Sequence, residues 1–315
     1  MNVIKNIKVR KTLVWALKLM LFVVVLFLFV KQISQLNISQ FYSLSFENPG
    51  YFILVILLLP FNWGFELLKW REILKANEIE YNLKKILSSL FSGVTTGIIT
   101  PNRIGNFIGR MLFFKGKVRS QLILGTLYSN FAQFSVTLIF GGISVLILHE
   151  TLFEAYGFYL SNLSILITVL SLGFYFAVPF IRLPNIGVLN RKQNVLSKFQ
   201  QHSKKFVFPL FFLSGVRYLV FSLQFILMLM TFGIEPTIDL LTGIFLLYFV
   251  STLTPSLLFG KLVVRETAGL IILSAFIENE AIIVVSSLLL WVINLGTPSL
   301  IGLFFIIRKK SFSNG

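Results

Sequence analysis

The stretch Gly97-Ile98-Ile99-Thr100-Pro101-Asn102-Arg103-Ile104-Gly105 interrupts an apolar segment that could otherwise enter a membrane. Pro101 cannot donate a backbone hydrogen bond, and it disfavours helix at the residue before it. Arg103, and Arg110 further along, place positive charges where a membrane span normally has none. The sequence therefore predicts that residues 86–114 form two short helices that turn at this proline.

The composition places the whole chain in a membrane. Of 315 residues, 56% are hydrophobic and 13% are charged, whereas soluble domains are about one quarter charged. Apolar runs of about 20 residues recur along the chain and strand alternation is absent, which favours helices over an outer-membrane barrel. The chain has no cysteine and two histidines, His149 and His202. No disulfide framework, metal site or cofactor is therefore expected.

Apolar length and charge predict the spans. An apolar run over residues 13–30 is too long for the apolar region of a signal peptide, so it is expected to be a retained span. A second broken segment, over residues 237–277, has its break at Thr254-Pro255. The fold class is therefore an all-α polytopic membrane protein, a single transmembrane domain over residues 1–315, with two re-entrant hairpins. Six spans are expected, at about 12–32, 51–70, 119–148, 158–181, 206–232 and 281–307.

The net charge of +16 is explained by loops on one side of a membrane rather than by nucleic acid. Most of the 28 lysines and arginines lie in residues 1–11, 69–85, 115–119, 182–205 and 308–310. The opposite face receives acidic residues, namely Glu47, Glu150, Glu154, Glu235, Asp239, Glu278 and Glu280. This bias predicts a multi-pass protein of the bacterial inner membrane with both termini in the cytoplasm.

The order of spans and hairpins occurs twice, once in residues 12–148 and again in residues 158–307. The first copy starts inside and the second outside, which makes them inverted-topology repeats as in many secondary transporters. A signature of Thr-Pro, then Gly, then Arg is common to both copies: Thr100, Pro101, Gly105 and Arg110 in one, Thr254, Pro255, Gly260 and Arg265 in the other.

The two broken segments are the candidate substrate site, with no catalytic or metal-binding residue among them. An arginine fork suits a phosphate, and the N-terminus of a broken helix adds backbone donors. If the hairpin tips meet near the membrane midplane, they form a site for an anionic headgroup. The candidates are Thr100, Pro101, Arg103, Gly105, Arg110, Thr254, Pro255, Gly260, Arg265 and Glu266, with Glu66 and Arg217 in possible support.

Each charged candidate also has a structural interpretation. Arg103 can cap the first half-helix, and Arg110 can lie at the membrane interface. Arg265 and Glu266 can form an internal ion pair. Glu66 and Arg217 can pair across two spans, and Lys261 can extend outward to the interface.

Three stretches resemble the transmembrane region of the lysylphosphatidylglycerol synthase family, also called flippase-like proteins. Residues 100–105 resemble its "TPGRIGE"-like motif, and residues 69–74 resemble its "RWxxLL" end of the second span. The late "P-x-P-x-G-x-G-x-x-E" motif corresponds to Thr254-Pro255, Gly260 and 264–266. The resemblance extends from about the first span to the sixth.

The chain departs from these motifs in two places. Asn102 and Asn106 stand where the family has Gly and Glu, and residues 256–259 replace the late Pro-Gly character. The soluble aminoacyl-transferase domain of well-known members is not expected here, so the resemblance does not imply synthase activity. It implies translocation of a lipid, or handling of a lipid-linked polar head.

The leading hypothesis is a lipid flippase or transporter, not an enzyme. It would move a phospholipid or a polyprenyl-phosphate-linked amphiphile between leaflets, with its headgroup at the tip arginines. One alternative is a membrane enzyme acting on a lipid phosphate, for which Glu266 is the only carboxylate near a tip. Another is a non-catalytic membrane partner of a glycosyltransferase or synthase.

Overall fold

A computed structural model describes residues 20, 23–24, 26–34, 38–100, 104–116, 118–153, 157–181, 197, 199–254 and 260–313. These residues form helices joined by turns and loops, without a strand among them, which confirms the all-α class. The helices whose bounds are fully described include α2 (Ile38–Tyr42), α3 (Pro49–Ala76), α4 (Leu83–Ile98), α5 (Gly105–Met111), α6 (Val118–Phe153), α7 (Gly157–Ala177), α9 (Val207–Thr231), α10 (Ile238–Leu253), α11 (Gly260–Leu273), α12 (Glu280–Trp291) and α13 (Thr297–Ser313).

Within the described part of the chain, five helical stretches are long and apolar enough to cross a membrane. They are Pro49–Ala76, Val118–Leu152, Gly157–Ala177, Val207–Thr231 and Glu280–Lys309. They correspond to five of the six predicted spans. The remaining one, over residues 12–32, lies mostly outside the described residues. The last stretch contains a π-helical turn, Val292–Gly296, between α12 and α13.

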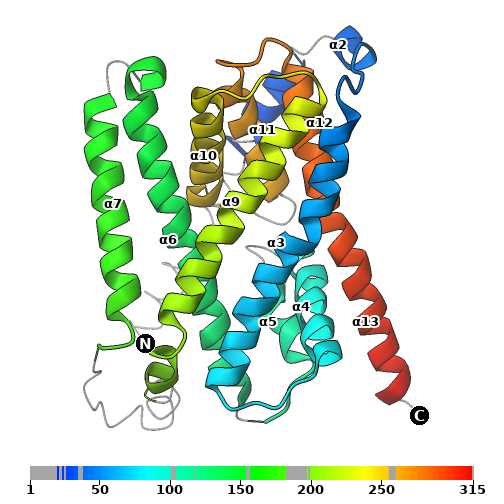
Figure 1. Cartoon of the computed structure of the whole chain (residues 1–315), viewed down its shortest axis with the longest axis vertical. Helices are drawn as coiled ribbons and strands as arrows, with labels where there is room; N and C mark the ends of the chain where they lie inside the picture. Colours follow the sequence, from blue (N-terminus) through cyan, green and yellow to red (C-terminus); the bar gives the residue numbers. More distant parts are fainter. Residues whose placement is uncertain are drawn as a thin grey trace, which may run out of the picture.

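Two pairs of short helices replace continuous spans at the predicted breaks. The pair α4 and α5 lies towards one end of the molecule, and the pair α10 and α11 towards the other (Figure 1). Side chains start the first helix of each pair: Asn82 accepts from the Lys85 amide at 2.8 Å, and Thr237 accepts from the Leu240 amide at 3.1 Å. In chain order, α4 and α5 lie between α3 and α6, and α10 and α11 lie between α9 and α12.

Small residues allow α4 and α5 to pack closely, side by side and antiparallel. A Cβ added to Gly105 would overlap the Thr96 carbonyl, and one added to Gly109 would overlap the Ser92 carbonyl. Thr96 Oγ1 donates to the Gly105 carbonyl at 2.6 Å. The two glycines are therefore required by close backbone approach.

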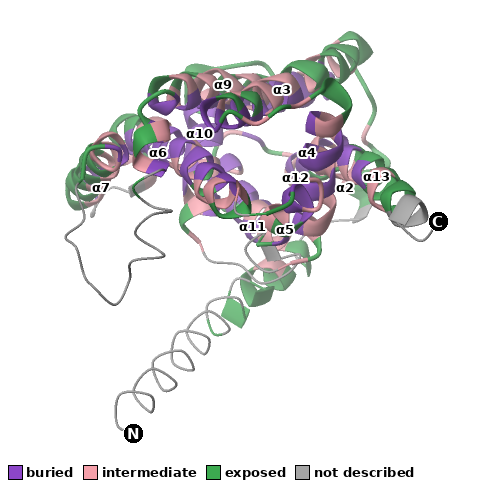
Figure 2. Ribbon diagram, turned by 90° about the horizontal axis from the view of Figure 1, so that it is seen from below, coloured by how far each residue is buried: buried purple, intermediate pink, exposed green. Residues whose placement is uncertain are grey.

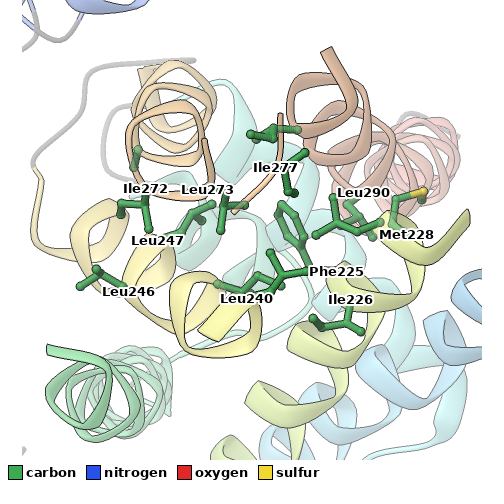
Figure 3. Close-up of a cluster of buried hydrophobic side chains, with 14 of the residues drawn as sticks. Phe225, Ile226, Met228, Leu240, Leu246, Leu247, Ile272, Leu273, Ile277 and Leu290 are labelled. Atoms are coloured by element: carbon green, nitrogen blue, oxygen red, sulfur yellow. The ribbon is translucent and has the colours of Figure 1, made fainter. Parts of the chain in front are cut away.

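Apolar side chains gather at both ends of the long helices, with polar residues between them. One core contains Val55 of α3 and much of α9 to α12, including Phe225, Ile244 and Leu273; Figure 3 shows part of it. A second core contains the other end of α3, the end of α7 and the start of α9, including Trp70, Leu74, Tyr175 and Leu210. The stretch of α3 between the cores buries Asn62, Glu66 and Lys69.

The C-terminal helix packs against the first short pair. Thr95 Oγ1 of α4 donates to the Ser299 carbonyl of α13 at 2.6 Å across 204 residues of sequence. A Cβ on Gly302 would overlap the Phe91 carbonyl. Seen from below, α13 lies beside α4 while α7 lies outside α6 (Figure 2). The two halves of the chain are thus interleaved rather than separate.

Candidate functional site

A cavity of about 750 Å³ lies between the two halves of the chain. Helices α3, α4, α5, α6 and α9 line it, together with the end of α10 and the start of α11. Its lining residues are Trp63, Glu66, Lys69, Val94, Ile104, Asn106, Phe107, Arg110, Leu127, Asn130, Phe131, Gln133, Phe134, Thr137, Arg217, Thr252 and Lys261. This volume is typical of sites for small ligands.

Glu66 is the centre of the charged groups in this cavity. Its Oε1 accepts from Arg110 Nη2 at 2.6 Å, and its Oε2 accepts from Arg217 Nη1 at 2.9 Å. Lys69 Nζ lies 3.4 Å from the same Oε2, one turn further along α3. The Glu66 side chain is only 7% exposed. One buried carboxylate thus fixes two guanidinium groups, from α5 and from α9, through separate oxygens.

Each arginine has further contacts that fix its orientation. Arg110 donates from Nε to Asn106 Oδ1 at 2.8 Å and lies over the Trp70 ring at 5.0 Å. Arg217 donates from Nε to Asn62 Oδ1 at 3.0 Å and lies over the Trp63 ring at 5.6 Å. A guanidinium held by a carboxylate, an amide and an aromatic face is preorganised for a ligand.

A buried amide network connects this site to the π-helical turn. Asn62 Nδ2 donates to Gln224 Oε1 at 3.2 Å and to Asn294 Oδ1 at 2.9 Å. Gln224 donates in turn to the Val55 carbonyl at 3.0 Å. Because π-helical turns are rare and are frequent at functional sites, the position of Asn294 supports a functional role for this region.

Lys261 extends into the cavity from the start of α11. Its Nζ donates to the Ser251 carbonyl at 2.8 Å and to the Thr254 carbonyl at 3.4 Å, both at the end of α10. A lysine at these positions satisfies helix-terminal carbonyls and complements the negative end of the helix dipole. The sequence allowed Lys261 to extend outward to the interface; in the structure its ammonium group binds backbone carbonyls at the end of α10 and lines the cavity.

The sequence model of the lysylphosphatidylglycerol synthase TM region matches residues 15–302, nearly the whole chain. The chain belongs to this family. No curated protein and no solved structure gave a match. The family's motif has an acidic residue at the position of Asn106. Here Asn106 binds Arg110, and the carboxylate partner of Arg110 comes from Glu66 on α3.

The predicted site residues of the first motif do not all line the cavity. Arg110 lines the cavity. Thr100 shapes the turn instead, because its Oγ1 accepts from the Gly105 amide at 2.7 Å and donates to the Thr96 carbonyl at 3.0 Å. Pro101 and Arg103 lie outside the described residues.

Among the described residues of the second motif, Thr254, Arg265 and Glu266 are not part of the lining of this cavity. Arg265 Nη2 lies 3.3 Å from Glu266 Oε1 and donates to the Ser287 carbonyl at 2.5 Å, which is the internal ion pair of the alternative interpretation. Thr254 Oγ1 donates to the Val250 carbonyl at 2.8 Å, and Gly260 begins α11. Pro255 lies outside the described residues. In the described lining, the cation from the second broken segment is Lys261 rather than Arg265.

Sequence reasoning did not identify Lys69, Asn62 and Asn106 as part of the site. The sequence places Lys69 where the predicted span 51–70 meets the basic segment 69–85, but α3 continues to Ala76 and the whole Lys69 residue is only 1% exposed. The spacing of Glu66 and Lys69 is the available signal, because residues three apart lie on one face of a helix. The expected pairing of Glu66 with Arg217 is present.

Proposed function

We propose that this protein moves a lipid with an anionic headgroup between the leaflets of the bacterial inner membrane. One observation carries the proposal: Arg110 and Arg217, from different halves of the chain, meet on one buried carboxylate at the wall of a cavity. Positive side chains at membrane depth are costly and occur mainly where a substrate or ion passes. The substrate class is a phospholipid or a polyprenyl-phosphate-linked amphiphile.

The length of α3 supports a position for this site within the membrane. Glu66 lies 17 residues after the start of α3 at Pro49 and 10 before its end at Ala76, which corresponds to about 25 Å and 15 Å of helix. With both termini in the cytoplasm, α4–α5 enters from the cytoplasmic side and α10–α11 from the outer side. The pairs then act as re-entrant hairpins of two inverted repeats that open the cavity alternately.

Apolar residues give the lipid chains a path. Ile104 and Leu127 line the cavity, yet 55% of Ile104 and 46% of Leu127 are exposed. The cavity wall thus continues onto the apolar surface near the start of α5 and on α6. In this arrangement the headgroup contacts the cations while its chains remain in the bilayer.

Reconstitution tests the proposal. Purified protein is placed in liposomes containing fluorescent phosphatidylglycerol in both leaflets, and dithionite then bleaches the outer leaflet. Transport predicts bleaching beyond one half of the label. Arg217→Gln should slow it at least about tenfold, since a hydrogen bond to a charged group contributes about 1.5–3 kcal/mol.

Arg71→Gln is the matched control. Arg71 lies on α3, the helix that carries Glu66, but it is exposed and is not part of the described cavity lining. No movement of phosphatidylglycerol, phosphatidate or polyprenyl phosphate by folded protein would refute the proposal. Release of a modified lipid product would instead identify an enzyme.

A further inference from the structure

The charges around the cavity do not balance. The described lining contains four basic side chains, Lys69, Arg110, Arg217 and Lys261, against the carboxylate of Glu66, a net charge of +3. Part of the surplus is balanced within the protein, since Lys261 binds carbonyls at the negative end of α10. The three cations around Glu66 still exceed its charge by two.

The arginines also retain donors. Glu66, Asn106 and Asn62 occupy the Nε and one terminal nitrogen of each guanidinium. Across the described structure, Nη1 of Arg110 and Nη2 of Arg217 have no hydrogen-bond partner. Arg110 is 2% exposed and lines the cavity. Neither nitrogen is among the buried side-chain atoms of the described residues that lack a partner, so both remain open to an acceptor that enters the cavity.

The surroundings make the imbalance costly. Trp63, Phe107, Phe131 and Phe134 form much of the rest of the wall, and a low dielectric strengthens both attraction and repulsion between charges. Breaking charge balance in such a place is destabilising, whereas an anion of matching charge relieves it. A group with close to two negative charges and several oxygens fits the surplus charge and the remaining donors.

We propose that the cavity selects headgroups ending in a phosphomonoester over phosphodiester, zwitterionic and cationic headgroups. A phosphomonoester carries about −1.5 to −2 charges at pH 7 and three acceptor oxygens. A phosphodiester has one charge, and a lysylated phosphatidylglycerol headgroup is net positive. This selectivity rests on the proposed transport function and narrows its substrate class to lipid phosphates, such as phosphatidate or a polyprenyl monophosphate.

Binding by the full-length protein in detergent micelles tests the selectivity. Trp63 and Trp70 lie against Arg217 and Arg110, so their fluorescence reports on the occupied site. The lipid probes are phosphatidate, phosphatidylglycerol and lysylphosphatidylglycerol with identical chains. The soluble probes are inorganic phosphate and glycerol 3-phosphate. Phosphatidate is expected to bind at least about tenfold more tightly than phosphatidylglycerol, with lysylphosphatidylglycerol weakest.

Variants separate charge from folding. Arg217→Gln should remove most of the preference for phosphatidate, Arg217→Lys should retain part of it, and Arg71→Gln should leave it unchanged. Arg217 is chosen because its side chain is 21% exposed, whereas that of Arg110 is 2% exposed. Retention of secondary structure by circular dichroism confirms that each variant is folded.

The outcomes distinguish the two proposals. Equal affinity for phosphatidate and phosphatidylglycerol, or tight binding of lysylphosphatidylglycerol, overturns the selectivity even if the liposome assay shows transport. Soluble phosphates that bind as tightly as phosphatidate confirm the phosphate site but count against a lipid substrate. Phosphatidate binding without lipid movement in liposomes supports the selectivity and refutes the transport function.

Discussion

Replacing Glu66 by Gln removes the carboxylate that balances the buried Lys69 and Arg110 and the part-buried Arg217. Its two oxygens accept hydrogen bonds at 2.6 Å from Arg110 and 2.9 Å from Arg217, with Lys69 at 3.4 Å. The amide retains one acceptor oxygen and turns an N–H₂ group towards a positive charge. A hydrogen bond to a charged group contributes about 1.5–3 kcal/mol, and removing one partner of a buried ion pair costs about 3–5 kcal/mol. We therefore expect Glu66→Gln to lower the unfolding free energy by about 3–5 kcal/mol.

The assay is unfolding of the purified protein by sodium dodecyl sulfate in mixed micelles, followed by tryptophan fluorescence. Glu72→Gln is the matched control on the same helix, because Glu72 is part-exposed and forms no ion pair within the described structure; it should change stability by less than about 0.5 kcal/mol. Adding Arg110→Gln to Glu66→Gln should cost at least about 1 kcal/mol less than the two changes summed. The reasoning fails if Glu66→Gln unfolds within about 1 kcal/mol of the wild type, or if the changes are additive.

Three further predictions concern other contacts. Gly109→Ala should lower the unfolding free energy by about 1–3 kcal/mol, because the added Cβ would overlap α4. Gly64→Ala is the control: its Cβ has open space, so it should raise the unfolding free energy by up to about 1 kcal/mol in the same assay. Trp70→Phe removes the 2.8 Å hydrogen bond from Nε1 to Ser89 Oγ. A double-mutant cycle with Ser89→Ala should give a coupling energy of about 0.5–1.5 kcal/mol. A coupling energy near zero would show that this hydrogen bond does not contribute to stability. Lys261→Met should slow lipid movement at least about tenfold, with Lys261→Arg retaining most of it; equal rates for both variants would show that the charge is not needed.

Apolar length and loop charge were enough to predict the helical framework. The five long helices lie where runs of apolar residues predicted spans, because a span needs about 20 such residues. The break after α4 follows from Thr100-Pro101, since proline restricts its own backbone and that of its neighbour. The partnership of Glu66 with Arg217 was predictable as well, because few acidic and basic residues are available inside the predicted spans.

The composition of the site was less predictable, because it depends on how helices from distant parts of the chain meet. Lys69 precedes Trp70-Arg71, a sequence typical of a membrane interface, yet α3 continues two turns further and buries it. The equivalence of Arg110 and Arg265 rested on spacing from a proline. The packing of α11 instead directs Lys261 to the cavity and Arg265 towards Ser287. Only the tertiary arrangement distinguishes these two positions.

The contact between α4 and α13 has a consequence for biogenesis. Thr95 and Ser299 are 204 residues apart, and ribosomes add about 5–20 residues per second, so α4 is made about 10–40 s before its partner. During that interval the groove that receives Gly302 is exposed to lipid or to the insertion machinery. A nascent chain released before α13 should therefore present an unfinished surface to quality-control proteases. Pulse-chase degradation of a chain truncated after α12, compared with the full length, would measure how much α13 protects it.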